Sequence, residues 1–259
     1  MAEREFCTVE RDGRLLIVTL NRPERYNALH FPAHFELAEI WDEFAADPEL
    51  WVAIVTGAGD KAFCAGNDLR FQAEGNVRKR CPTGFAGLTN RYNLNKPVIA
   101  AVNGFAMGGG FEVALACDLI VAAENAIFAL PEPRVGLMAG AGGVHRLPRL
   151  IGQKRALGMI LTGRRVGPEE GKELGFVNEV VPEGEAVAGA RRWAGQILEC
   201  APISIRASKE AVYAGLDEAT LEAAINRTYE EQHVLIDSAD YIEGPKAFAE
   251  KRPPVWRNE

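Results

Sequence analysis

The chain has 259 residues, of which 47% are hydrophobic and 25% charged, a composition typical of a folded globular protein. Its formal net charge of −7 argues against a nucleic-acid-binding surface. The first residues lack the apolar run of a signal peptide, and polar residues interrupt the longest apolar region, 98–123, so we expect a cytoplasmic protein without a membrane span.

The first half of the chain predicts alternating strands and helices. The apolar run 15–20 predicts a strand, and Asn27 is a candidate N-cap for a helix whose apolar residues recur at helical spacing up to Phe44. A second buried strand is predicted over 52–56, followed by a loop over 61–69. The order strand, helix, strand indicates a parallel sheet.

The central stretch, 96–132, carries a glycine cluster at a predicted strand-to-helix junction. A buried strand is predicted over 97–102 and a buried helix over 113–117, with the glycines 108–110 between them. Glycine allows a sharp turn and the close approach of a ligand. Because the first amides of a helix have no intrahelical partner, this place suits negative charge developing on a substrate oxygen.

Two glutamates accompany the glycine cluster. Glu112 lies in the same turn, within a segment so apolar that an acid there needs a partner or a function. Glu132 stands between Pro131 and Pro133, whose fixed φ angles stiffen the loop. Free amides beside two acids predict acid–base chemistry next to a carbonyl group. Packing alone explains many glycine-rich turns, however, so spacing leaves both interpretations open.

The second half of the chain turns from strands to helices. Extended segments are predicted over 119–123, 126–128 and 177–181. Helices are predicted over 153–161, 168–174, 183–199, 202–214, 216–236 and 243–252. A second glycine cluster lies at 140–143. We expect an α/β core over 1–190 and a helical region over 191–259.

No metal site is predicted. The five cysteines show neither metal-ligand spacing nor a disulfide framework, so we expect them to be reduced. His30 and His34 are four residues apart, but Pro32 lies between them and no glutamate follows as in a zinc-protease helix.

Four motifs, in this order and at these separations, carry a family resemblance. They are Ala62–Leu69, Lys96–Gly104, Gly108–Glu112 and Pro131–Glu132. The chain thereby resembles the crotonase superfamily of enoyl-CoA hydratases and isomerases over nearly its whole length. The resemblance implies an α/β crotonase-like spiral of repeated β-β-α units, followed by C-terminal helices that assemble trimers or dimers of trimers.

The same resemblance implies an activity. The substrate would be an acyl-CoA thioester, with no cofactor beyond the CoA that the substrate carries. The backbone N–H groups of Asn67 and Gly109 would form the oxyanion hole, Glu112 would help to activate water, and Glu132 would exchange a proton with the α-carbon. Two acids favour reversible hydration of a 2-enoyl-CoA, a lyase reaction, because the family's isomerases generally use one. The alternatives are an isomerase or another acyl-CoA enzyme of the superfamily, and a non-catalytic CoA- or RNA-binding member.

The resemblance also implies contacts with CoA and a narrower group of enzymes. The segment from Ala65 to Arg70, with Ala65, Asp68, Leu69 and Arg70, matches the family's loop that lines CoA. Arg25 and Lys251 are candidate partners for the CoA phosphates, Lys251 from a neighbouring subunit, and an ordinary solvated surface position is the alternative for both. Four further segments carry a narrower resemblance: Gly84–Thr89, Gly110–Glu112, Phe128–Glu132 and Glu243–Trp256. Through them the chain is most similar, within the superfamily, to the carnitinyl-CoA dehydratases, where an aromatic residue is expected in place of Asn67. Because aromatic faces hold quaternary ammonium groups, the candidates for that role here are Phe85, Tyr92, Phe111 and Trp256.

Overall fold

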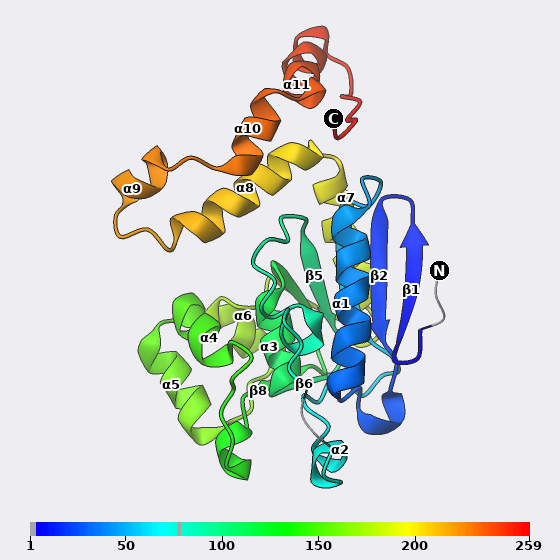
Figure 1. Cartoon of the computed structure of the whole chain (residues 1–259), viewed down its shortest axis with the longest axis vertical. Coiled ribbons are helices and arrows are strands. Elements are labelled where there is room, and N and C mark those ends of the chain that lie inside the picture. Colours follow the sequence, from blue (N-terminus) through cyan, green and yellow to red (C-terminus); the bar gives the residue numbers. More distant parts are fainter. Residues whose placement is uncertain (1–3, 77–78) are drawn as a thin grey trace.

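The computed structural model describes residues 4–76 and 79–259, whose strands form two sheets (Figure 1). The larger sheet has the order β1 (Cys7–Asp12), β2 (Leu15–Leu20), β3 (Val52–Gly57), β5 (Val98–Val102), β7 (Leu119–Ala123) and β9 (Glu179–Val181). Its first pair is antiparallel and all later pairs are parallel. The smaller sheet is parallel and contains β4 (Ala62–Cys64), β6 (Phe105–Met107) and β8 (Ile127–Ala129).

Successive strands alternate between the two sheets. β3 leads to β4, β5 to β6 and β7 to β8, and a helical segment follows each pair. These segments are α2 (Leu69–Ala73), α3 (Gly109–Ala116), and the 3-10 turn η3 (Glu132–Val135) with α4 (Gly143–Ile151). The predicted α/β fold of repeated strand–strand–helix units is confirmed. After the third unit come α5 (Gln153–Thr162) and α6 (Pro168–Leu174).

Helices cover both faces of the larger sheet. α1 (Phe31–Ala46) buries Trp41 and Phe44 against one face, and α7 (Ala186–Leu198) buries small residues such as Ala190 against the other. Because both faces are covered, β3 and β5 are buried along their whole length, which explains their uninterrupted apolar runs. The predicted boundary at residue 190 falls within α7, and the division of the chain into two parts remains a prediction.

The predicted N-cap of α1 was wrong. The helix begins after His30, whose Nδ1 accepts a hydrogen bond from the Ala33 N–H at 3.4 Å. Asn27 has a φ of +55° and holds a loop, because its side chain accepts from the Arg22 N–H at 3.0 Å and donates to the Ala62 carbonyl at 2.7 Å. An Asn is tolerated in this left-handed conformation, which serves turns as well as caps.

Three further element predictions were wrong. The loop expected over 61–69 contains the strand β4. The helix expected over 216–236 is divided into α9 (Leu221–Asn226) and α10 (Glu230–Ile236). The glycine cluster follows β6 and not the strand at 97–102 directly, so one short strand was missed there and β1 was missed at the start. A strand of three residues is too short to show the alternation by which strands are recognised.

The C-terminal arm, residues 202–259, extends away from the two sheets (Figure 1). It contains α8 (Pro202–Gly215), α9, α10 and α11 (Ala239–Glu250). Lys209 on α8 attaches the arm to the core by donating to Asp118 Oδ2 at 2.7 Å and to the Lys96 carbonyl at 2.9 Å. No helix among residues 4–76 and 79–259 has both the length and the apolarity to cross a membrane.

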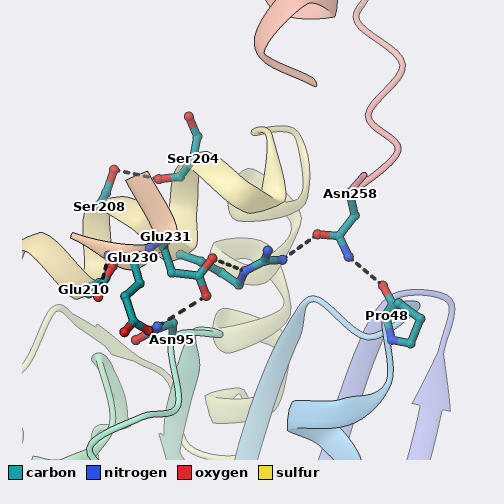
Figure 2. A network of polar contacts seen from close by, with 9 residues as sticks. Pro48, Asn95, Ser204, Ser208, Glu210, Glu230, Glu231 and Asn258 are labelled. Carbon is teal, nitrogen blue, oxygen red and sulfur yellow. Dashed lines mark hydrogen bonds and ion pairs between the residues drawn. The ribbon is translucent and has the colours of Figure 1, made fainter. Parts of the chain in front are cut away.

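A polar network attaches the end of the arm to the core (Figure 2). Asn95 donates to Glu231 on α10, which also accepts from Arg206 Nε at 2.9 Å. Arg206 donates in turn to the side chain of Asn258, and Asn258 Nδ2 donates to the Pro48 carbonyl at 3.0 Å. The last residues of the chain therefore contact the turn after α1.

Candidate active site

The fold brings together the two backbone segments in which an oxyanion hole was predicted. Gly66 lies against the start of α3, because a Cβ built on Gly66 would be 3.0 Å from the Gly109 nitrogen. Leu29 forms ladder bonds with the residues on either side of Asn67: its N–H donates to Gly66 and its carbonyl accepts from Asp68, each at 2.8 Å. In the part of the chain that the structure describes, neither the Asn67 nor the Gly109 N–H has a backbone acceptor.

Only glycine fits where α3 begins. Gly108 has a φ of +54°, in the region that favours glycine. A Cβ on Gly109 would be 2.6 Å from the ring of Phe85, and one on Gly110 would be 1.9 Å from the Cys64 carbonyl oxygen. The close packing of α3 against β4 and against the ring of Phe85 therefore fixes the direction of the Gly109 N–H.

Glu112 is buried in the first turn of α3, with 3% of its surface exposed. Its Oε1 accepts a hydrogen bond from the Gly143 N–H at 2.8 Å. Burial, with a smaller contribution from the nearby Glu132, raises the pKa of this carboxyl to about 7, although the backbone amides of Gly143 and Ala141 and the charge of Arg146 act in the opposite direction. Near neutral pH, Glu112 can therefore exist in both protonation states.

Glu132 lies across from the glycine turn. Its Oε1 is 2.8 Å from the position that a Cβ on Gly108 would occupy, and burial raises its pKa. Its Oε2 is buried and has no hydrogen-bond partner within residues 4–76 and 79–259. A buried polar atom without a partner is costly, so its presence in a native structure needs an explanation, and contact with a bound molecule provides one.

The residues predicted to bind CoA do not all lie together. Ala65 and Asp68 lie in the loop before α2, and Leu69 and Arg70 are the first residues of that helix. Asp68 is buried, caps the helix through the Phe71 N–H at 3.1 Å and pairs with Arg22 at 3.0 Å. Arg25 is exposed on the turn before α1. Lys251 ends α11, and Figure 1 shows α11 and α2 at opposite ends of the long axis. Within one chain Lys251 is therefore far from the loop, and its predicted role remains one across subunits.

Of the four aromatic candidates, only Phe85 contacts the glycine turn. Phe111 is buried on the other side of α3, where its ring packs against Phe128 and Phe176. Tyr92 is 82% exposed, and Trp256 packs between Gly244 of the arm and the end of α7, where it donates to the Glu199 carbonyl. Among the four candidates, Phe85 is thus the one whose ring lies against the predicted oxyanion hole.

Sequence reasoning did not assign a role to the second glycine cluster or to Arg146. The cluster supplies the Gly143 and Ala141 amides that face Glu112, 31 residues away in the sequence for Gly143. Glycines at 140–143 were a visible signal, but nothing in the sequence gave their partner. Among the described residues, no group of three or more His, Cys, Asp or Glu side chains is placed to share a metal ion.

The chain is similar to known proteins over nearly its whole length. The sequence model of the family described as "Enoyl-CoA hydratase/isomerase" matches residues 10–259. The chain is 48% identical to a carnitinyl-CoA dehydratase of Escherichia coli (strain K12) and 47% identical to one of Salmonella typhi, each over 98% of both chains. A crystal structure of an enoyl-CoA hydratase from Mycobacterium marinum has a TM-score of 0.92 at 39% identity, covering 98% of this chain and 99% of that one. A carnitinyl-CoA hydratase from Mycobacterium avium has a TM-score of 0.79 at 41% identity, covering 99% and 100%.

Proposed function

The chain belongs to the enoyl-CoA hydratase/isomerase family, and from that premise we propose that it catalyses the reversible addition of water to a 2-enoyl-CoA thioester. One observation carries the proposal: Glu112 and Glu132, two carboxyl groups with raised pKa, accompany the Asn67 and Gly109 amides, for which the described part of the chain offers no backbone acceptor. Acid–base catalysis near neutral pH needs groups that titrate in this range.

The two amides would bind the thioester carbonyl oxygen. Hydrogen bonds from the Asn67 and Gly109 N–H groups draw electrons toward that oxygen, so that the β-carbon becomes electrophilic and the enolate that forms is stabilised. Removing one such donor typically raises a barrier by about 2.7–4 kcal/mol. The helix dipole of α3 adds to the stabilisation because Gly109 is its first residue.

The two glutamates would move the protons. A water oxygen forms a bond to the β-carbon while the ionised Glu112 takes one of its protons. Protonated Glu132 then gives its proton to the α-carbon, and the enolate collapses to the 3-hydroxyacyl thioester. Dehydration is the reverse of these steps. The unpartnered Glu132 Oε2 supports this assignment, because a substrate α-carbon or a water would fill the space it faces.

For the acyl group we propose a carnitine type, a 3-hydroxyacyl chain ending in a quaternary ammonium. The relatives named carnitinyl-CoA dehydratase support this choice. Phe85 supports it as well, because its ring lies on Gly109 and an aromatic face attracts such a cation. Carnitinyl-CoA dehydratases are expected to have an aromatic residue at the position of Asn67. In this chain Phe85 would perform the role of that residue.

Turnover in H₂¹⁸O tests the function and the substrate class together. The assay compares crotonyl-CoA, crotonobetainyl-CoA and branched or aryl enoyl-CoAs by mass spectrometry. The expected result is a +2 mass shift with crotonobetainyl-CoA as the best substrate. Intact acyl-CoA binding without label in any product would refute hydration and favour isomerisation.

The Glu132→Gln variant tests the mechanism. It keeps the shape of the side chain and removes proton transfer, so kcat should fall by about 10²–10⁴-fold while the affinity for an unreactive acyl-CoA stays within about tenfold. Glu124→Gln is the matched control, because Glu124 is exposed in the turn after β7. Near-normal turnover of Glu132→Gln would refute the assigned role.

We further propose that the arm binds a second copy of the chain. Residues 216–243 hold eight acids and one Arg, whereas 133–168 hold seven Arg and Lys and no acid. Apolar side chains stand exposed on the arm at Leu216, Leu221, Ile225, Ile242 and Phe248. Light scattering should give three or six times 28.2 kDa, and Leu221→Glu with Ile225→Glu should lower that mass. A monomer at micromolar concentration would refute the assembly.

A further inference from the structure

Arg146 bridges two loops that lie on different sides of the proposed site. It is half-buried on the first turn of α4. Its NH2 donates to the Thr89 carbonyl at 2.7 Å, and its NH1 reaches the Ala141 carbonyl at the longer distance of 3.5 Å. Within residues 4–76 and 79–259, no carboxylate forms an ion pair with this guanidinium. A half-buried charge held only by carbonyl groups is unusual enough to need a reason.

One hydrogen bond of Arg146 reaches the segment that carries Thr89 and Phe85, beside the proposed oxyanion hole. Thr89 is fully buried, and its Oγ1 accepts a hydrogen bond from the Phe85 N–H at 2.9 Å. The ring of Phe85 in turn lies against Gly109, the residue whose N–H would hold the thioester oxygen. Two hydrogen bonds therefore link Arg146 to Phe85 through Thr89.

The other hydrogen bond of Arg146 reaches the loop that holds Glu112. Ala141 and Gly143 offer their amides to the Glu112 carboxylate, and Arg146 lies one turn beyond them. The intervening Gly142 leaves the space for the guanidinium, because a Cβ built there would collide with Arg146 NH1. The glycine at 142 and the arginine at 146 thus form one packing unit.

We propose that Arg146 is a positioning residue: by holding the Thr89 and Ala141 carbonyls it fixes the segment that carries Phe85 relative to the loop that holds Glu112, and it keeps its positive charge beside that loop. The inference rests on the proposed hydration. The charged groups that act on Glu112 are Glu132, from the turn before α4, and Arg146, from α4 itself. The remaining contacts of the carboxylate are the backbone amides of the second glycine cluster.

The test compares three variants with the wild-type protein. Arg146→Met removes the charge and both hydrogen bonds, and Arg146→Lys keeps the charge but loses the fork that spans two carbonyls. Arg149→Met is the matched control, because Arg149 lies on the same helix, is exposed and donates only to the His145 carbonyl, one turn back on α4. Thermal melts identify variants that fail to fold.

The expected results separate positioning from simple stability. In Arg146→Met, kcat should fall at least tenfold with KM within threefold, and the acid limb of the kcat/KM profile should move to higher pH, because a lost positive charge raises the pKa of Glu112. Arg146→Lys should keep the limb in place and lose part of kcat. Arg149→Met should match the wild type. The proposal would be overturned if folded Arg146→Met kept both the wild-type kcat and the wild-type acid limb of the kcat/KM profile. It would also be overturned if Arg149→Met showed the same losses as Arg146→Met.

An infrared titration without substrate separates this inference from the proposed function. The carboxylate band of Glu112, identified by its absence in Glu112→Gln, should titrate at a higher pH in Arg146→Met than in the wild type. If the wild type hydrates no enoyl-CoA, the proposed function fails while this titration still decides whether Arg146 acts on Glu112. An identical titration in both proteins would refute that action whatever the activity.

Discussion

The buried Glu112 carboxyl makes a prediction about stability that needs no substrate. Its pKa in the folded protein is about 7, against an ordinary value of 4.5. Between these pH values the folded chain binds more protons at this site than the unfolded chain. The free energy of unfolding therefore decreases as pH rises through this window, and the loss is complete about one pH unit above the folded pKa.

The magnitude follows from the two pKa values. At 1.36 kcal/mol for each unit of pKa, the difference corresponds to about 3 kcal/mol of stability lost between about pH 4.5 and pH 8. Glu112→Gln abolishes the titration, although its amide faces backbone N–H groups and adds a constant cost of its own. This constant cost does not change with pH. The change with pH of the difference in unfolding free energy between variant and wild type therefore reports only the titration of Glu112.

The assay is urea unfolding of the wild type, Glu112→Gln and the exposed control Glu124→Gln at a fixed protein concentration. The stability of Glu112→Gln relative to the wild type should rise by about 3 kcal/mol from pH 4.5 to pH 8, whereas that of Glu124→Gln should stay constant. A difference between Glu112→Gln and the wild type that does not change with pH would refute the conclusion that burial raises this pKa.

Three further changes have defined outcomes. Gly110→Ala places a Cβ 1.9 Å from the Cys64 carbonyl oxygen, so thermal melts should show a loss of at least about 2 kcal/mol together with reduced turnover. Asp68→Ala removes the cap of α2 and the partner of Arg22, and should cost about 1–3 kcal/mol while raising KM for acyl-CoA more than it lowers kcat. Asn67→Ala keeps the backbone N–H, so steady-state kinetics should give kcat within about threefold of the wild type.

Both candidate glutamates could be recognised in the sequence because each lies in an unusual local context. Glu112 is an acid within an apolar helix, and Glu132 is held between two prolines, so both drew attention without any structure. The family resemblance then supplied their roles. The partner of Glu112 was not accessible, because the Gly143 amide reaches it only through the way α4 packs on α3.

The fold was predictable where elements are long and apolar. The strands 15–20, 52–56 and 98–102 have five or more apolar or small residues in a row, and the structure places each of them in the larger sheet. β6 was missed because three residues carry too little pattern. The break between α9 and α10 was missed because no Gly or Pro marks it.

The alternation of strands between the two sheets has a consequence for how the chain folds. Neither sheet is encoded by a contiguous segment, and the larger one is completed only when β9 pairs with β7, more than fifty residues later. Forming such a pair of strands first closes a long loop of chain. The entropy cost of this closure comes before any stabilising contact forms, so folding is slowed. During synthesis, the edge of β7 stays unpaired until β9 has left the ribosome, and the newly made chain is open to aggregation throughout that interval.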